Sequence, residues 1–160
     1  MGQKIEEKIL KVYFENPDKE FTIREISKLT KIARSTVHKK LKEIKKQPYF
    51  KDGLFFKVKK ANYYIEGLFF SGVVNFLIKE LNPSLIILFG SFRKGESNKE
   101  SDIDLFVESP LKKDLNLGKF EKILGHKIDL FVESDLKKLN DNLLNNVING
   151  IKIYGSFKLK

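Results

Sequence analysis

The sequence predicts a two-domain α+β fold, in which residues 1–67 form a small domain that begins with helices and residues 68–160 form an α/β unit with a mixed sheet. Two observations support this division. Apolar residues recur at helical spacing in the first half, whereas the second half contains short apolar runs that alternate as strands do. Positive charge is also uneven, because residues 1–67 have a net charge of +8 and residues 68–160 a net charge of +2. This excess is typical either of a domain that binds a polyanion or of a lysine-rich solvated surface.

Three helices are expected near the N-terminus. The first spans residues 4–14 and ends at Asn16-Pro17-Asp18. The second begins with a capping box, since Thr22 and Glu25 can satisfy each other's backbone N–H groups, and Phe21 precedes them as a hydrophobic staple. The third carries basic residues on its outer faces. Its inward-facing stripe is expected to be Ala33, Val37, Leu41 and Ile44.

A β-hairpin is expected next, because residues 54–58 and 63–65 are rich in aromatic and β-branched residues and flank a polar turn at residues 59–62. Helices followed by a hairpin resemble the winged helix of many prokaryotic transcription regulators, and residues 23–44 resemble their helix-turn-helix. The resemblance implies binding to double-stranded DNA and transcription regulation, with the third helix in the major groove. The alternative is a module for protein docking or dimerisation. The residues expected to contact DNA are Arg34, Ser35, Thr36, Lys39, Lys40, Lys57, Lys59 and Lys60.

The segment 69–78 is apolar nearly all round, so we expect a helix that is buried on more than one side. It forms either the joint between the two domains or part of a homodimer contact. It is about half as long as the roughly 20 residues that a membrane span requires. The sequence has no cysteine, and its first residues lack the apolar core of a signal peptide. We therefore expect a cytoplasmic protein with no membrane partner.

Residues 85–89 are apolar and are typical of a buried strand, which ends at Gly90-Ser91. Glycine lets the backbone approach a ligand closely, and the Ser91 hydroxyl with the N–H groups of a following helix would offer donors to phosphate. Further along, Asp102 and Asp104 alternate with apolar residues, so both carboxylates should project from one face of a second strand. Two such carboxylates repel each other unless a cation lies between them, and Mg²⁺ suits oxygen ligands of this kind.

The heptapeptide at residues 103–109 recurs letter for letter at residues 128–134, which makes Asp129 the counterpart of Asp104. We therefore expect two neighbouring strands that each offer an aspartate. His126, just before the second copy, is expected at a surface or strand edge. The remaining elements expected are a covering helix over residues 115–124, a helix over residues 139–148 and a last strand over residues 151–154.

These motifs together resemble the signature of the DNA polymerase β superfamily of nucleotidyltransferases, over roughly residues 70–154. The closest resemblance is to its minimal members, which include antitoxins paired with HEPN-type ribonuclease toxins. Arg93 and Gly95 lie where those proteins commonly carry an Arg-Gly pair. The segments that carry the resemblance are Phe89-Gly90-Ser91, Asp102-Ile103-Asp104-Leu105 and Ile128-Asp129-Leu130.

The resemblance implies a polymerase-β-like nucleotidyltransferase unit that transfers a nucleotide, most simply AMP from ATP or another NTP, to a hydroxyl of a protein or an RNA. Two Mg²⁺ ions are the implied cofactors, and a HEPN-type toxin or another protein is an implied acceptor. The implied catalytic and metal-binding residues are Asp102, Asp104 and Asp129, and the implied nucleotide-binding residues are Gly90, Ser91 and Arg93.

Two functional hypotheses stay open at this point. In the first, an enzyme is coupled to a DNA-binding domain, as in an antitoxin that modifies a toxin and represses its own operon. In the second, a DNA-binding transcriptional regulator carries a nucleotidyltransferase domain that only senses nucleotide or is catalytically silent. The two differ in whether pyrophosphate is released and in whether an acceptor is modified.

Overall fold

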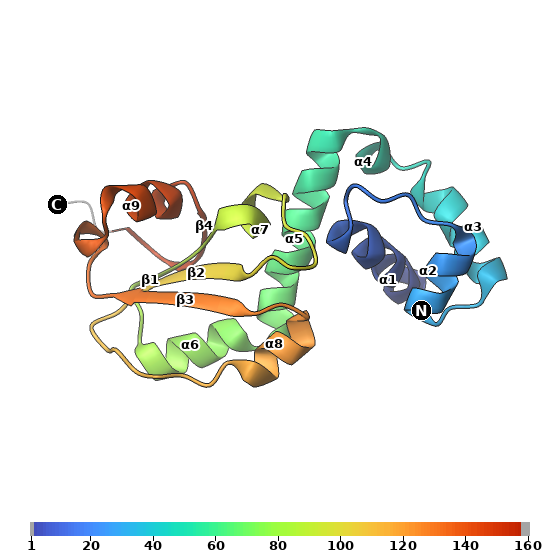
Figure 1. Cartoon of the computed structure of the whole chain (residues 1–160). Coiled ribbons are helices and arrows are strands. Elements are labelled where there is room, and N and C mark those ends of the chain that lie inside the picture. Colours follow the sequence, from blue (N-terminus) through green and yellow to red (C-terminus); the bar gives the residue numbers. More distant parts are fainter. Residues whose placement is uncertain (1, 158–160) are drawn as a thin grey trace.

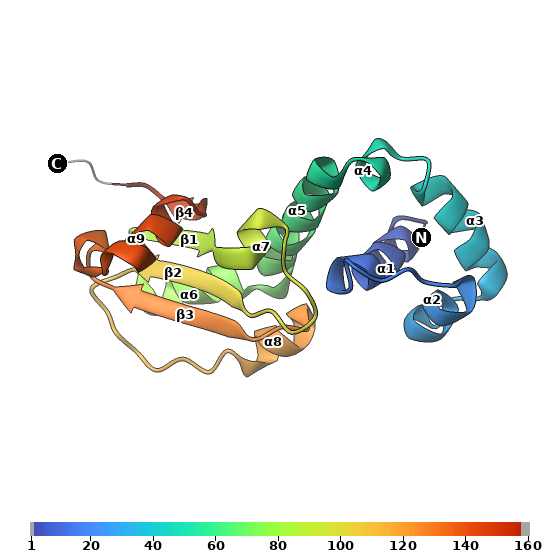
Figure 2. The ribbon, with the colours of Figure 1, turned by 45° about the horizontal axis from the view of Figure 1, so that its top comes forward.

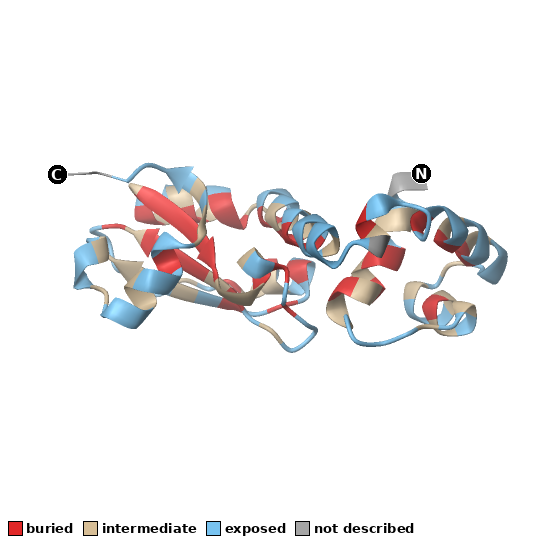
Figure 3. Cartoon of the chain, turned by 90° about the horizontal axis from the view of Figure 1, so that it is seen from above, coloured by how far each residue is buried: buried red, intermediate tan, exposed pale blue. Residues whose placement is uncertain are grey.

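The computed structural model describes residues 2–157 (Figure 1). A group of helices at the N-terminus is joined through a long helix to a mixed sheet that has helices on both faces. Among the described residues, no helix is both long enough and apolar enough to cross a membrane. Figure 3 shows the buried residues in the strands of the sheet and on the inward faces of the helices.

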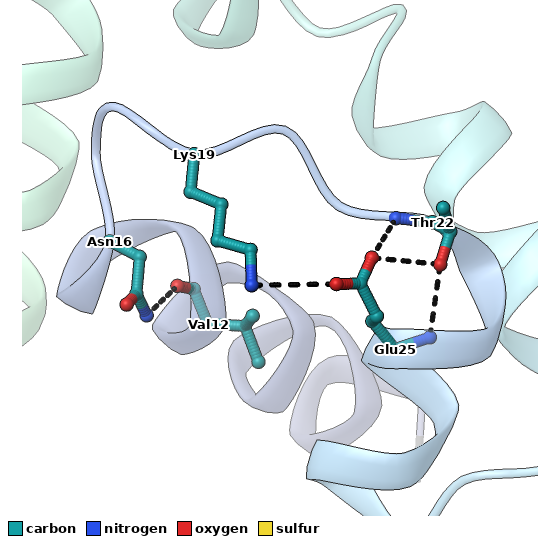
Figure 4. A network of polar contacts seen from close by, with 5 residues as sticks. All are labelled: Val12, Asn16, Lys19, Thr22 and Glu25. Carbon is teal, nitrogen blue, oxygen red and sulfur yellow. Dashed lines mark hydrogen bonds and ion pairs between the residues drawn. The ribbon is translucent and has the colours of Figure 1, made fainter.

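The first helices are α1 (Gly2–Glu15), α2 (Ile23–Thr30) and α3 (Arg34–Ile44). The capping box is confirmed, because the Thr22 backbone N–H donates to Glu25 Oε2 at 2.9 Å and the Glu25 N–H donates to Thr22 Oγ1 at 3.2 Å (Figure 4). A turn of three residues joins α2 to α3, starting at Lys31 in the left-handed conformation with φ 58°. The inward stripe of α3 is confirmed except at Ala33, which is exposed and lies just before the helix as its N-cap residue. Its buried members are Val37, Leu41 and Ile44.

The predicted hairpin is wrong, because α4 (Pro48–Lys51) leads into one long helix, α5 (Gly53–Ser71). Asp52 caps α5, and its carboxylate accepts hydrogen bonds from two N–H groups of the first turn at 2.9 and 3.1 Å. The expected turn contains no glycine, and its Ala61 favours a helix. The buried residues of α5 recur every three or four positions, so packing of this face outweighs the strand propensity of its aromatic residues. They are Lys60, Ala61, Tyr64, Leu68 and Ser71.

The apolar segment 69–78 is divided between two helices, because Gly72 adopts a φ of 84° and ends α5. The next helix, α6 (Val73–Leu81), buries its apolar face, whereas Phe70 before the break is 88% exposed. The expectation of one helix buried on several sides is therefore correct only for α6. α5 lies between the N-terminal helices and the sheet (Figure 2), so α5 forms the joint. Because α5 continues without a break past residue 67, the division into domains of residues 1–67 and 68–160 remains a prediction.

The sheet has four strands in the order β3-β2-β1-β4 within the described residues. β1 pairs antiparallel with both β2 and β4, whereas β2 and β3 are parallel, so the expectation of a mixed sheet is confirmed. The two copies of the heptapeptide form β2 and β3 and lie in register. The strands are β1 (Leu85–Phe89), β2 (Ile103–Glu108), β3 (Ile128–Glu133) and β4 (Ile151–Gly155).

Helices cover the two faces of the sheet unequally (Figure 1). On one face, α6 and α8 (Gly118–Leu124) pack against Ile103, Leu105 and Val107. On the other face, Phe106 belongs to a smaller apolar cluster with β1 and α9 (Asp141–Ile148), close to a 3₁₀ turn at Leu136–Lys138. Burying each such large apolar side chain contributes roughly 1.5–3 kcal/mol. The alternation along β2 therefore fixes which side chains face α9.

Candidate active site

Asp104 and Asp129 lie side by side on the two parallel strands, because the register pairs Asp104 with Asp129 directly. Asp104 lies two residues before Phe106 on β2, so their side chains project from the same face of the sheet. Phe106 packs in the cluster beneath α9. Asp129 likewise lies two residues before Phe131 on β3 and shares its face. The Phe131 ring centroid is 5.6 Å from that of Phe89, a member of the same cluster. Both carboxylates therefore project from the α9 face, on the two neighbouring strands that the repeated sequence predicted.

The three predicted aspartates are close enough to influence one another. The pKa of Asp104 is raised above its ordinary value, mainly by burial and then by the negative charges of Asp129 and Asp102. Asp104 is half-buried, whereas Asp102, just before β2, and Asp129 are exposed. This arrangement creates a concentration of negative charge at the end of the sheet where β2 and β3 begin.

The glycine turn after β1 lies directly against the central carboxylate. Gly90 adopts a φ of 69°, and a Cβ atom built on it would lie 1.9 Å from Asp104 Oδ2. Both the left-handed conformation and the overlap with the Asp104 carboxylate disfavour a side chain at this position. The short helix α7 (Gly90–Lys94) begins at this glycine and is anchored by the fully buried Phe92. Ser91 and Arg93 are half-buried on α7.

A family model described as a nucleotidyltransferase domain matches residues 71–155, which is more than half of the chain. The chain belongs to the nucleotidyltransferase family. Its activity class is nucleotidyl transfer, and the match contains all four strands, the glycine turn and the three aspartates. No curated protein and no solved structure matches the chain significantly. Helices α1 to α4 of this nucleotidyltransferase lie outside the matched segment.

A group that the sequence did not identify holds the segment before Asp102. His126 is 5% exposed rather than superficial, and its Nδ1 lies 2.9 Å from the carbonyl oxygen of Ser101. Its Nε2 lies 3.4 Å from the Tyr64 hydroxyl, and its ring makes an edge contact with Phe92. Burial lowers the pKa of His126, so the neutral ring donates from Nδ1 to the carbonyl. The signal was available in the repeat, because the register of β2 and β3 brings residue 126 level with residue 101.

The donor set of this nucleotidyltransferase fits a divalent cation by its chemistry. Asp104 and Asp129 project from one face of the sheet and Asp102 directly precedes β2, and the negative charges of Asp129 and Asp102 disfavour the charged form of Asp104. A cation would relieve that repulsion, and hard oxygen ligands suit Mg²⁺. Within residues 2–157, however, no three His, Cys, Asp or Glu side chains are assembled closely enough to enclose one ion. Assignment of the metal ligands therefore stays a prediction.

The lysines assigned to a wing lie on α5 and have other partners. Lys57 Nζ lies 2.7 Å from Glu96 Oε1. Lys60 is 1% exposed and donates to the carbonyl oxygen of Ser97, while burial lowers its pKa to about 8. Of these three lysines, only Lys59 makes no ion pair or hydrogen bond to the loop of residues 96–102, and its side chain is exposed. The prediction that these residues follow the DNA backbone as a wing is wrong, because the wing is a helix and Lys60 is inaccessible.

The residues of α3 assigned to DNA differ in how accessible they are. Lys40 is held by two carboxylates, with its Nζ 2.7 Å from Glu43 Oε2 and 3.7 Å from Glu6 Oε2. It is therefore less available to a phosphate than the residues around it. Arg34, Ser35 and Lys39 are exposed, and Thr36 is half-buried.

Proposed function

We propose that the nucleotidyltransferase moves AMP from ATP to a hydroxyl of a protein or an RNA in a Mg²⁺-dependent reaction. The observation that supports this most strongly is the register that puts Asp104 beside Asp129, against the Gly90 turn. An anion-binding turn next to a group of carboxylates is what a triphosphate with its metal requires. The family match supports nucleotidyl transfer as the reaction class.

In this proposal, different residues bind the phosphates and accept the proton. Gly90 and Ser91 bind the outer phosphates through backbone N–H groups and the Ser91 hydroxyl, and Arg93 pairs with a phosphate oxygen. The acceptor oxygen forms a bond to the α-phosphorus. The bond between that phosphorus and the oxygen that bridges the α- and β-phosphates breaks, and pyrophosphate leaves. The exposed Asp129 accepts the proton of the acceptor hydroxyl.

Asp102, Asp104 and Asp129 hold the Mg²⁺ ions, which supply charge stabilisation to the attacking and leaving oxygens when bound. His126 acts through the backbone, because its contact with the Ser101 carbonyl orients the residue before Asp102. It is a positioning residue in this proposal.

A second function is favoured by the exposed basic side chains of α3. Arg34 and Lys39 are exposed beside a buried apolar stripe, and α2 and α3 are joined by a tight turn, as in a helix-turn-helix. We propose that this pair of helices binds double-stranded DNA, so that the protein acts as an antitoxin-like regulator of its own expression. A regulator that only senses nucleotide is the competing proposal.

The transfer proposal is tested with ATP labelled on the α-phosphate, Mg²⁺, and either the protein alone or total cellular RNA and protein as acceptors. The wild type should attach label to an acceptor and release pyrophosphate, and Asp104→Asn should abolish both. Asp114→Asn is the matched control, because Asp114 is an exposed residue of the loop between β2 and α8. Equal labelling by Asp104→Asn and the wild type would contradict the proposal. Nucleotide binding without pyrophosphate release would favour the sensor.

A further inference from the structure

A basic cleft lies between the N-terminal helices and the loop that precedes β2. Its volume is about 560 Å³, and it is lined by residues of α1, the segment between α1 and α2, α2, the turn after α2 and the loop of residues 96–102. None of the aspartates of the active site lines it. Its charged residues are Lys8, Lys11, Lys19, Lys31, Lys99 and a single acid, Glu15.

Ion pairs compensate only part of this charge. Lys11 Nζ lies 3.4 Å from Glu15 Oε1, and Lys19 Nζ lies 3.4 Å from Glu25 Oε1 at the rim (Figure 4). The remaining lysines of the cleft are exposed, and they have no ion pair among the described residues 2–157. They are Lys8, Lys31 and Lys99. Three uncompensated cations around one hollow favour a ligand with several negative charges.

The apolar part of the lining indicates which kind of polyanion fits. Phe21 and Val12 line the cleft, and Leu29 beside them is 60% exposed. The Phe21 ring packs edge-on against Tyr13, and Lys19 Nζ lies 4.8 Å from its centroid. An aromatic side chain flanked by lysines is the combination that single-stranded nucleic acids use, since a base stacks on the ring while the backbone lies along the cations. An acidic peptide would use the lysines but would gain little from the ring.

The cleft is attached to the loop that carries Asp102. The backbone N–H of Lys99 donates to the Glu15 carbonyl oxygen at the end of α1, at 2.9 Å. Lys99 precedes Asp102 by three residues, so the two Cα atoms lie within about 11 Å of each other at full extension. The cleft therefore shares a loop with Asp102.

We propose that this cleft binds single-stranded nucleic acid, as a site separate from both the nucleotide site and the exposed face of α3. If the proposed transfer reaction holds, the bound strand is its acceptor, and this role alone rests on the proposed function. Lys8 and Lys99 contact backbone phosphates, and a base displaces the Lys19 ammonium from the Phe21 ring to stack there.

The test is fluorescence anisotropy with a short labelled oligoadenylate RNA, measured over a range of salt concentrations. Lys8→Glu with Lys99→Glu should weaken binding by about tenfold or more, and the salt slope should fall by about 1.4 for two lost phosphate contacts. Lys79→Glu with Lys152→Glu is the matched control, since both lysines are exposed and lie away from the cleft on α6 and β4. Phe21→Leu keeps the charge and should also weaken the RNA complex.

Unchanged RNA binding in the cleft variant, or an equal loss in the control, would overturn the proposal. Stronger competition by polyglutamate than by unlabelled oligoadenylate would also overturn it, in favour of an acidic protein partner. The thermal midpoint of each variant shows whether it is folded. A titration of the same variants with Mg²⁺-ATP separates this result from the proposed function, because the cleft variant should keep the nucleotide-induced shift of the wild type.

Discussion

Asp104 and Asp129 are direct neighbours on parallel strands of identical sequence, and the Gly90 turn closes over the first of them. The two carboxylates therefore owe their proximity to strand register rather than to loop conformation. A site built on strands is held more firmly than one built on loops. The predictions below test what this relationship implies.

Replacing the turn glycine should disable the site while leaving the fold. Gly90→Ala introduces a Cβ atom at 1.9 Å from Asp104 Oδ2 and forces a side chain into the left-handed region, which costs about 1–2 kcal/mol before the overlap is relieved. Both the thermal midpoint and the stabilisation by Mg²⁺-ATP should fall. Gly53→Ala is the control, because nothing lies within 4 Å of its added Cβ, and it should raise stability by about 0.4–1 kcal/mol. An unimpaired nucleotide response in Gly90→Ala would contradict the close approach.

The free energy of unfolding should depend on the protonation of Asp104. Its pKa is raised in the folded state, so the folded protein binds the proton more tightly than the unfolded chain. The contribution of Asp104 to the free energy of unfolding should therefore fall as the pH rises from about 3.8, the ordinary pKa of an aspartate, through the raised pKa. Asp104→Asn should remove this dependence and unfold at a higher temperature than the wild type at neutral pH without ligand. Denaturation curves at several pH values check both statements, and a less stable Asp104→Asn would show that repulsion is not significant.

Acidification should destabilise the protein through His126. The pKa of His126 is lowered from 6.5 by burial, so its contribution to stability is complete above 6.5 and is lost as pH falls through the lowered value. His126→Ala should reduce the free energy of unfolding by about 1–3 kcal/mol, since the Ser101 carbonyl loses its donor. It should also weaken the response to Mg²⁺-ATP, which a purely structural role elsewhere would not do. The exposed His38 is the control, and His38→Ala should change neither quantity.

Binding to double-stranded DNA should depend on α3 and not on α5. Arg34→Ala with Lys39→Ala should weaken binding to a DNA duplex and reduce the salt slope by about 0.9 for each lost phosphate contact. Lys57→Ala with Lys59→Ala should have no such effect, because these residues lie on a helix and not on a wing. The measurement is anisotropy with labelled duplex. If only the Lys57→Ala with Lys59→Ala variant lost DNA affinity, the prediction would be contradicted, and α5 would contact DNA as a wing was expected to.

The strands and the aspartates were predictable because their signals are local and repeated. The identical heptapeptides fix both the strand period and the pairing of Asp104 with Asp129, and Gly90 marks the end of β1 unambiguously. The capping box at Thr22 was equally local. These features depend either on neighbouring residues or on an exact repeat, and both can be recognised in the sequence.

The hairpin and the role of His126 were not predictable in the same way. Residues 54–65 are rich in side chains that suit strands, and only packing of Tyr64 and Leu68 against the rest of the protein makes them helical. The buried environment of His126 is built from α5, α7 and the segment before β2 together. Such contacts join residues that are distant in sequence. For His126 the repeat indicates only that residue 126 lies level with residue 101, and not that its ring is buried.

The most direct test of the central claim is a thermal-shift titration with Mg²⁺-ATP that compares the wild type with Asp104→Asn. A ligand at a hundred times its Kd adds about 2.7 kcal/mol to the state that binds it, which moves the midpoint of a small protein by several degrees. The account predicts that the wild-type midpoint rises with Mg²⁺-ATP and that the midpoint of Asp104→Asn does not. Equal shifts in the two proteins, or no shift in the wild type with any Mg²⁺-NTP, would contradict it.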